Sequence, residues 1–205
     1  ENKNLAIEEI KNNLSDDLIV KPNSLGSSIG VKACNKENFT EQIEAIFEIQ
    51  DDALVENRVT NMIELNQACV STIDGLILSA IEQPLSNHEF LTFDDKYLGG
   101  KTKGKDRIIP AKIDEKLKEK IDETTKHIYK KLNFSGIVRI DYIYDLDNFT
   151  LYFNEANTIP GSMAFYLFEP IGIDYISLID LLINNEKQTK KYLYFNTNIL
   201  NKTSF

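Results

Sequence analysis

The segment from residue 136 to 161, GIVRIDYIYDLDNFTLYFNEANTIPG, constrains the fold of this chain most strongly. Two runs that are rich in β-branched and aromatic residues, 137–144 and 150–153, flank residues 145–148 (DLDN), whose composition is typical of a turn. The pattern predicts a β-hairpin. Residues 157–161 (NTIPG) then break the second strand abruptly, as expected for a loop that forms part of a site.

The alternation of side chains along this hairpin makes it a candidate metal site. Arg139 and Asp141 share one face of the first strand, and Glu155 and Asn157 share one face of the second. If the hairpin folds about residues 147–148, Asp141 lies opposite Glu155, with about 4.5–5.5 Å between the Cβ atoms. Two carboxylates and an amide oxygen would then converge, and a hard cation such as Mg²⁺ would remove their repulsion. The alternative is a solvated acidic surface, but these acids lie within apolar strands.

The overall composition excludes several classes of protein. The 205 residues can bury a core, in one domain or two. The formal net charge of −9 argues against a nucleic-acid partner, because phosphate binding needs a basic face. We expect no membrane span, because no apolar run approaches the roughly 18 residues that one needs. We also expect no signal peptide, and two reduced, buried cysteines, Cys34 and Cys69, in a cytoplasmic protein.

A lysine and a loop of small residues form a candidate phosphate site. Lys21 ends a short apolar strand, where a single positive charge can be directed at a phosphate. Residues 23–30 (NSLGSSIG) follow, and glycine N–H groups with serine hydroxyls can contact an anion closely. This is not a Walker loop, because a strand follows it in place of a helix. An ordinary hairpin turn is the alternative.

Two further stretches are candidates for contacting a nucleotide. Glu56 ends a strand over residues 53–57, and Glu64 follows after a short connector. Backbone groups of a connector can contact adenine edges, and a carboxylate can accept from both ribose hydroxyls. The basic, glycine-rich stretch 89–110 suggests a lid that delivers a lysine to phosphate. Surface glutamates and a solvated loop are the alternatives.

Other periodic patterns predict the remaining elements. Apolar residues at helical spacing predict helices over 5–14, 35–50, 111–132 and 174–184. An Asp-Gly turn at residues 74–75 predicts an antiparallel pair of strands over 63–72 and 76–82. The start of the chain at Glu1, within polar sequence, leads us to expect that it is part of a longer protein.

Together these motifs resemble the D-alanine–D-alanine ligases of the ATP-grasp family. The order, spacing and identity of the segments match over residues 18 to about 183, and the segments are LIVKPNSLGSSIGV (18–31), LVEN (54–57) with Glu64, FDDKYLGG (93–100), GIVRIDYIYD (136–145) and YFNEANTIPG (152–161). The resemblance implies an α+β chain with the ATP-grasp fold, in which mostly antiparallel sheets are flanked by helices and two subdomains hold ATP between them.

The resemblance also implies boundaries and a role for each matched residue. The implied parts are residues 1–64 (phosphate flap and adenine hinge), 65–185 (lid loop and Mg-binding hairpin) and a tail, 186–205. ATP phosphates would be contacted by Lys21 and Lys96 and covered by a flap of Ser27, Ser28, Ile29 and Gly30. Adenosine would be held by Glu56, the backbone of Asn57 and Val59, and Glu64.

The same resemblance supplies the reactive end of the site. Mg²⁺, or Mn²⁺ as an alternative, would be held by Asp141, Glu155 and Asn157. Ser27 and Tyr97 would help to place the first amino acid. Arg139 and the Gly161 backbone would stabilise the transferred phosphate and the tetrahedral intermediate.

The implied activity is the ATP-dependent ligation of two D-alanines through an acyl phosphate, for peptidoglycan precursor synthesis and cell-wall biogenesis. ATP and D-alanine would be the small-molecule partners, in the cytoplasm, with a homodimer as the assembly of a full-length protein. Family members also carry an N-terminal domain and an upstream lysine that contacts phosphate. Because the chain lacks both, we expect this fragment alone to be inactive.

One position departs from the family pattern. Tyr166, followed by Leu167, stands where the family usually places a small hydroxyl residue that meets the carboxylate of the second substrate. A related ligase that joins a different amino or hydroxy acid therefore stays open. So does a non-catalytic nucleotide-binding module, although the intact set of charged and amide residues argues against it.

Overall fold

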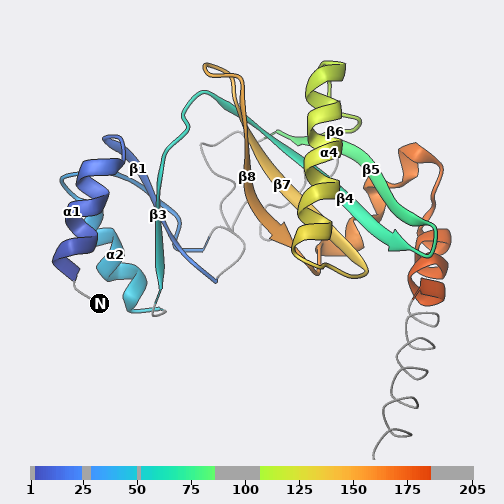
Figure 1. Ribbon diagram of the computed structural model, residues 1–205, viewed down its shortest axis with the longest axis horizontal. Helices are drawn as coiled ribbons and strands as arrows, with labels where there is room; N and C mark the ends of the chain where they lie inside the picture. Colours follow the sequence, from blue (N-terminus) through green and yellow to red (C-terminus); the bar gives the residue numbers. More distant parts are fainter. Residues whose placement is uncertain (1–2, 25–28, 50–51, 86–106, 186–205) are drawn as a thin grey trace, which may run out of the picture. The chain divides into compact units, whose positions relative to one another are not determined.

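The computed structural model describes residues 3–24, 29–49, 52–85 and 107–185 (Figure 1). They form two compact units, the first ending at Thr60 and the second beginning at Asn61. Each unit is an antiparallel sheet packed against helices, which confirms the predicted α+β class. Within the described residues, no helix combines the length and the apolar character that a membrane crossing requires.

The first unit is a three-stranded sheet with two helices on one face. Its strands are β1 (Asp17–Pro22), β2 (Lys32–Asn35) and β3 (Ala53–Asn57), in the order β2-β1-β3, and its helices are α1 (Lys3–Asn13) and α2 (Phe39–Phe47). Leu18 and Val20 alternate along β1 and are fully buried against Phe39 and Ile46 of α2. The predicted short apolar strand is confirmed, and its alternate side chains form the core of this unit.

Helix α2 is shorter than the predicted 35–50, because two asparagines form a turn before it begins. The Asn35 side chain accepts hydrogen bonds from the backbone N–H groups of Glu37 (2.9 Å) and Asn38 (3.1 Å). The Asn38 side chain accepts one from the backbone N–H of Asn35 (2.9 Å). These local bonds compete with helical ones, so the helix starts only at Phe39.

The second unit is a five-stranded antiparallel sheet in the order β6-β5-β4-β7-β8 (Figure 1). Its strands are β4 (Met62–Thr72), β5 (Gly75–Pro84), β6 (Arg107–Ile108), β7 (Ile137–Asp145) and β8 (Thr150–Asn157). The two predicted hairpins, β4–β5 and β7–β8, are both confirmed. The strand β7 lies between β4 and β8, at the centre of the site described below.

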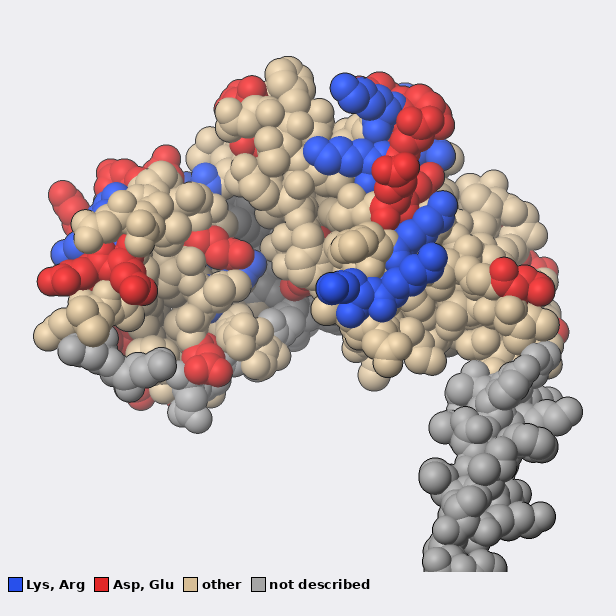
Figure 2. Space-filling view, in the orientation of Figure 1, with Lys and Arg blue, Asp and Glu red and all other residues tan. Residues whose placement is uncertain are grey.

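One face of this sheet packs against α4 (Glu115–Lys131). Leu117 and Ile121 of the helix meet Ile140 of β7 in the core. The helix begins four residues later than the predicted 111, because the Asp114 side chain caps it by accepting a hydrogen bond from the backbone N–H of Leu117 at 2.8 Å. Charged side chains cover the outer face of α4 (Figure 2). The apolar residues of this helix therefore form a single stripe, which faces the sheet.

The opposite face packs against the segment after β8, which contains η1 (Gly161–Leu167), η2 (Glu169–Ile171) and a helix over 175–185. Ala164, Leu167 and Phe168 are fully buried against the sheet. Ser162, Met163 and Ala164 all have left-handed backbone angles, with φ of 51°, 52° and 48°. Such angles are strained for residues other than glycine, and the buried contacts hold them in place.

A buried polar network joins α4 to the sheet. The Gln67 side chain donates to Asp122 Oδ1 (2.6 Å) and to the Ser79 carbonyl (3.2 Å), and accepts from Thr125 Oγ1 (2.7 Å). The Thr125 hydroxyl also lies 2.8 Å from the Tyr142 hydroxyl. Because Gln67, Thr125 and Tyr142 are all buried, their polar groups depend on one another for hydrogen bonds.

We expect Thr125→Val to lower the free energy of unfolding by about 1–3 kcal/mol, because it leaves Gln67 and Tyr142 with an unpaired buried group. Urea unfolding monitored by circular dichroism measures this. Thr124→Val is the matched control, since the Thr124 hydroxyl bonds only the Lys120 carbonyl on its own helix. Equal unfolding midpoints for the two variants would contradict the prediction.

The two cysteines differ in exposure, which corrects the prediction that both are buried. Cys69 is fully buried, and this burial raises the pKa of its thiol to about 12. Cys34 is only partly buried, because it lies on the outer strand β2, and burial raises its pKa as well.

We therefore expect one thiol of the native chain to react with a thiol-specific reagent such as DTNB, and the second to react only after unfolding. The thiolate is the reactive form, and Cys69 is both inaccessible and protonated at neutral pH. A Cys34→Ser variant should lose the fast phase of labelling. A fast phase that persists in this variant would show that Cys69 is accessible.

Candidate functional site

The register of β7 and β8 gathers four polar side chains on one face of the second unit. Asp141 pairs with Glu155, and Arg139 pairs with Asn157. The predicted opposition of Asp141 and Glu155 is confirmed. Directly opposed residues share a face, so the four side chains form a square of two acids, one guanidinium and one amide.

This arrangement depends on a β-bulge. Nearer the turn, Tyr142 pairs with Phe153, and an unbroken ladder would place Glu155 opposite Ile140, on the face that packs against α4. The pairing instead shifts by one residue between Asp141 and Tyr142. The shift turns Glu155 onto the face of Asp141, which is a way in which bulges next to functional sites redirect side chains.

Asp141 is nearly buried and is paired with Arg139. The guanidinium donates two hydrogen bonds to it, from Nε to Oδ1 and from Nη2 to Oδ2, both of 2.7 Å. Burial raises the pKa of Asp141, and the hydrogen bonds and charge of Arg139 oppose part of that rise. A bidentate pair of this kind fixes the orientation of both side chains.

The amide of Asn157 lies between the two acids. Its Nδ2 donates to Asp141 Oδ2 at 2.9 Å and to Glu155 Oε1 at 3.4 Å. The position between the carboxylates therefore already attracts a positively polarised group, and a half-turn of the amide would present its oxygen instead. Carboxylate and amide oxygens are the ligands that Mg²⁺ prefers, so this donor set fits a hard cation.

No group of three or more His, Cys, Asp or Glu side chains that could hold a metal gathers within the parts of the chain that the structure describes. The set at the hairpin has only two such residues, Asp141 and Glu155, with the amide of Asn157 as the third donor. An ion bound here would complete its shell with water or with ligand oxygens, as Mg²⁺ commonly does.

Glu82 extends this polar row, and the sequence analysis did not identify it. Asn66 of β4 pairs with Asp141 on one side and with Glu82 of β5 on the other, so all three share a face. The Asn66 amide donates to Glu82 Oε2 at 3.3 Å. Glu82 is only 3% exposed. Glu82 could have been found by the same sequence feature that pointed to Asp141, which is an acid within an apolar strand.

Lys21 and Glu56 meet in the first unit. They lie diagonally on β1 and β3, and Lys21 Nζ is 2.6 Å from Glu56 Oε2. The Asn57 side chain accepts a hydrogen bond from the backbone N–H of Ser15 at 2.7 Å, so it anchors the start of β1. Val59 is partly buried in the connector that follows β3.

The remaining predicted site residues are distributed as follows. Gly30 has a φ of +76°, and a Cβ there would lie 2.8 Å from Pro22 Cγ, so this position requires glycine. Ile29 is exposed beside it. Glu64 lies on β4, within the second unit, and Gly161 opens η1 with space around it for a side chain. Outside the described residues lie Ser27, Ser28, Lys96 and Tyr97.

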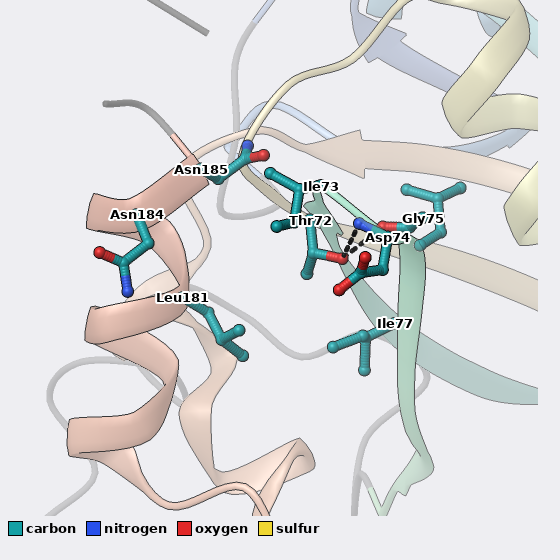
Figure 3. Close-up of a pocket in the computed structure, with 9 residues that line it drawn as sticks. Thr72, Ile73, Asp74, Gly75, Ile77, Leu181, Asn184 and Asn185 are labelled. Atoms are coloured by element: carbon teal, nitrogen blue, oxygen red, sulfur yellow. Dashed lines mark hydrogen bonds between the residues drawn. The ribbon is translucent and has the colours of Figure 1, made fainter. Parts of the chain in front are cut away.

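A separate pocket of about 590 Å³ lies between the turn of the β4–β5 hairpin and the helix over 175–185 (Figure 3). Ile77 and Leu181 point into it from opposite sides, and Asn184 and Asn185 line the helix side. It contains none of the site residues named above and holds no acid other than Asp74. We therefore assign no catalytic role to it.

Comparison with known proteins identifies the family. The family model described as "D-ala D-ala ligase C-terminus" matches residues 1–184. The D-alanine–D-alanine ligase of Thermosipho melanesiensis is 39% identical over 192 residues, which cover 92% of this chain and 52% of that protein.

Solved structures give the same result for the fold. The VanG D-Ala:D-Ser ligase from Enterococcus faecalis matches with a TM-score of 0.73 at 31% identity, covering 89% of this chain and 53% of that one. The D-alanine–D-alanine ligase from Helicobacter pylori matches with a TM-score of 0.63 at 26% identity, covering 89% and 51%. The chain thus spans about half the length of the relatives it matches. With its ATP-grasp fold, the chain belongs to the family of D-alanine–D-alanine ligase C-terminal domains.

Proposed function

We propose that the chain is the ATP- and Mg²⁺-binding portion of a cytoplasmic ligase that joins two D-alanines, through an acyl phosphate, for peptidoglycan precursor synthesis. The observation that carries this proposal is the square of Arg139, Asp141, Glu155 and Asn157 on one sheet face. Membership of the ligase family supports it. Because the chain spans about half the length of the relatives it matches, we propose the activity for a protein of their full length and expect none from residues 1–205 alone.

In this proposal Asp141, Glu155 and Asn157 hold Mg²⁺, which neutralises phosphate charge when bound. Arg139 is a permanent cation beside the two acids, held in place by two hydrogen bonds. It would stabilise the transferred phosphate and the tetrahedral intermediate, together with the Gly161 backbone. This division of labour suits phosphoryl transfer, which depends on positioning and charge neutralisation more than on covalent help.

The nucleotide itself would be held largely by the first unit. Lys21 would contact phosphate, and its 2.6 Å pairing with Glu56 fixes both side chains before a ligand arrives. Glu56, Glu64 and the backbone of Asn57 and Val59 would hold adenosine. The phosphate flap would be formed by Ser27, Ser28, Ile29 and Gly30. Lys96 would contact phosphate, and Tyr97 and Ser27 would help to place the first amino acid.

The reaction has two steps. The carboxylate of the first D-alanine attacks the γ-phosphorus of ATP, which gives an acyl phosphate and releases ADP. The amine of the second D-alanine then attacks the acyl carbon, loses a proton and displaces inorganic phosphate. Each step joins two bound groups, so most of the rate enhancement comes from holding them in reach of one another.

One observation favours a second candidate function, ligation to an acceptor other than D-alanine. Tyr166 replaces the small hydroxyl residue expected at the second-substrate position, and its ring lies against Arg107. The VanG enzyme, a D-Ala:D-Ser ligase by name, is 31% identical to this chain. A bulky tyrosine can change which acceptor fits.

Asp141→Asn and Glu155→Gln, made in the full-length parent protein, are each expected to lower kcat for ATP-dependent phosphate release by about 10²–10³-fold, because each removes one charge from the cation site. Both should also raise the Mg²⁺ concentration needed for half-maximal rate. Glu119→Gln, on the exposed face of α4, is the control. Unchanged turnover and Mg²⁺ dependence in both site variants would contradict the metal assignment.

Phosphate release by the full-length parent, with Mg-ATP and single or paired D- and L-amino acids and D-lactate, tests the substrates. We expect release with D-alanine alone, and formation of the dipeptide by mass spectrometry. Release that requires D-serine or another second partner would favour the related ligase. No release with any pair, despite binding of Mg-ATP, would overturn the proposed activity.

A further inference from the structure

A second polar cluster lies beside the metal-site candidate, on the same face of the sheet, and is built around Glu82. Glu82 Oε1 lies 3.1 Å from Arg107 Nη1, and Glu82 Oε2 accepts a hydrogen bond from the Tyr166 hydroxyl at 3.2 Å. The Arg107 guanidinium also lies over the Tyr166 ring, 4.6 Å from its centre. A buried carboxylate, a guanidinium and a phenol thus fix one another.

The hydroxyl of Tyr166 has one proton, and it already donates that proton in a hydrogen bond to Glu82. Glu82 is an acceptor only, so the tyrosine must be the donor in their hydrogen bond. Burial, reinforced by the charge of Glu82, raises the pKa of Tyr166, so the hydroxyl stays protonated at neutral pH. Tyr166 can therefore accept a further hydrogen bond but cannot donate one to a substrate carboxylate.

Arg107 is the group in this cluster that can still donate. Its side chain is 48% exposed, whereas that of Glu82 is 4% exposed. Within the described residues its ion pair is with Glu82, through Nη1 alone. A guanidinium has five N–H donors in a planar fork that matches a carboxylate, and the ion pair with Glu82 engages only Nη1 among the residues that the structure describes.

The position of this cluster suits the far end of a bound product. Glu82 on β5 and Asp141 on β7 lie on either side of β4. Their strands are therefore two strand spacings apart, about 9–10 Å. The acceptor residue extends only about 3.5 Å beyond the new bond, so the long side chains of Arg139 and Arg107 must cover the rest of that separation. With the new bond forming beside Arg139, the acceptor carboxylate would then lie on the side of Arg107.

We propose that Arg107 binds the carboxylate of the acceptor substrate, the second amino acid, and that Glu82 is a positioning residue that holds Arg107 and Tyr166 in place for this contact. The inference rests on the proposed ligase function. It also gives Tyr166 a role, because its ring supports the guanidinium and its hydroxyl oxygen can accept a hydrogen bond from a donor such as the acceptor amine.

The test compares D-alanine with D-alaninamide, an acceptor without the negative charge, in the full-length parent protein. Dipeptide and dipeptide-amide formation are measured as kcat/KM for the acceptor, with the first D-alanine and ATP saturating. We expect the parent to prefer D-alanine, and Arg107→Met to reduce that preference about 10- to 100-fold by raising KM for D-alanine. The KM values for ATP and for the first D-alanine should stay unchanged. Lys116→Met removes an exposed charge from α4 and is the control.

Two further variants keep the outcome interpretable if Arg107→Met weakens folding by leaving the buried Glu82 carboxylate without its ion-pair partner. Arg107→Lys keeps the charge and should retain part of the preference. Tyr166→Phe should retain all of it, because the hydroxyl does not donate to the carboxylate. Loss of the preference in Tyr166→Phe, with an unchanged preference in Arg107→Met, would overturn the assignment.

The same data separate this inference from the function on which it rests. If the parent makes no product with any acceptor, the ligase function fails and the inference fails with it. If the parent is active and Arg107→Met discriminates D-alanine from its amide as the parent does, only the assignment of Arg107 is wrong.

Discussion

The direction in which side chains leave the five-stranded sheet is the constraint on which the second unit depends. One face buries Leu65, Val138 and Ile140 against α4, and the other carries the polar row and packs against the segment after Gly161. Because side chains alternate along a strand, an error of one residue in register would exchange these two faces. The bulge between Asp141 and Tyr142 shifts the pairing of β8 by one residue. Beyond the bulge, Glu155 lies on the polar face and Ala156 on the face that packs against α4.

The sequence predicted most of the elements, because their apolar periods match their burial. It predicted the pairing of Asp141 with Glu155, but the turn at 147–148 does not produce that pairing without the bulge. The local composition does not indicate where a bulge occurs, so the register shift that produces this pairing could not be predicted from the sequence. The helix boundaries were wrong where polar side chains, at Asn35 and Asp114, bond the backbone locally. Glu82 was missed because its relation to Asp141 runs across β4, and only the sheet order reveals it.

Three of the described candidate cations, one in the first unit and two in the second, are each paired with an acid of the same unit. Lys21 faces Glu56, Arg139 faces Asp141 and Arg107 faces Glu82. Pairing of this kind lets a chain with a net charge of −9 hold positive groups in fixed orientations. The pairs hold long, flexible side chains in single orientations, so less conformational entropy is lost when a ligand is bound.

The left-handed turn over residues 162–164 links the core to the position of Tyr166. Each of its residues adopts a backbone angle that costs about 1 kcal/mol or more, and the burial of Ala164, Leu167 and Phe168 against Leu178 holds the turn in that form. Tyr166 lies between those buried anchors and reaches Glu82 only while they stay packed. Substitutions in the hydrophobic interior can therefore move the Tyr166 hydroxyl without changing any residue of the polar row on the sheet.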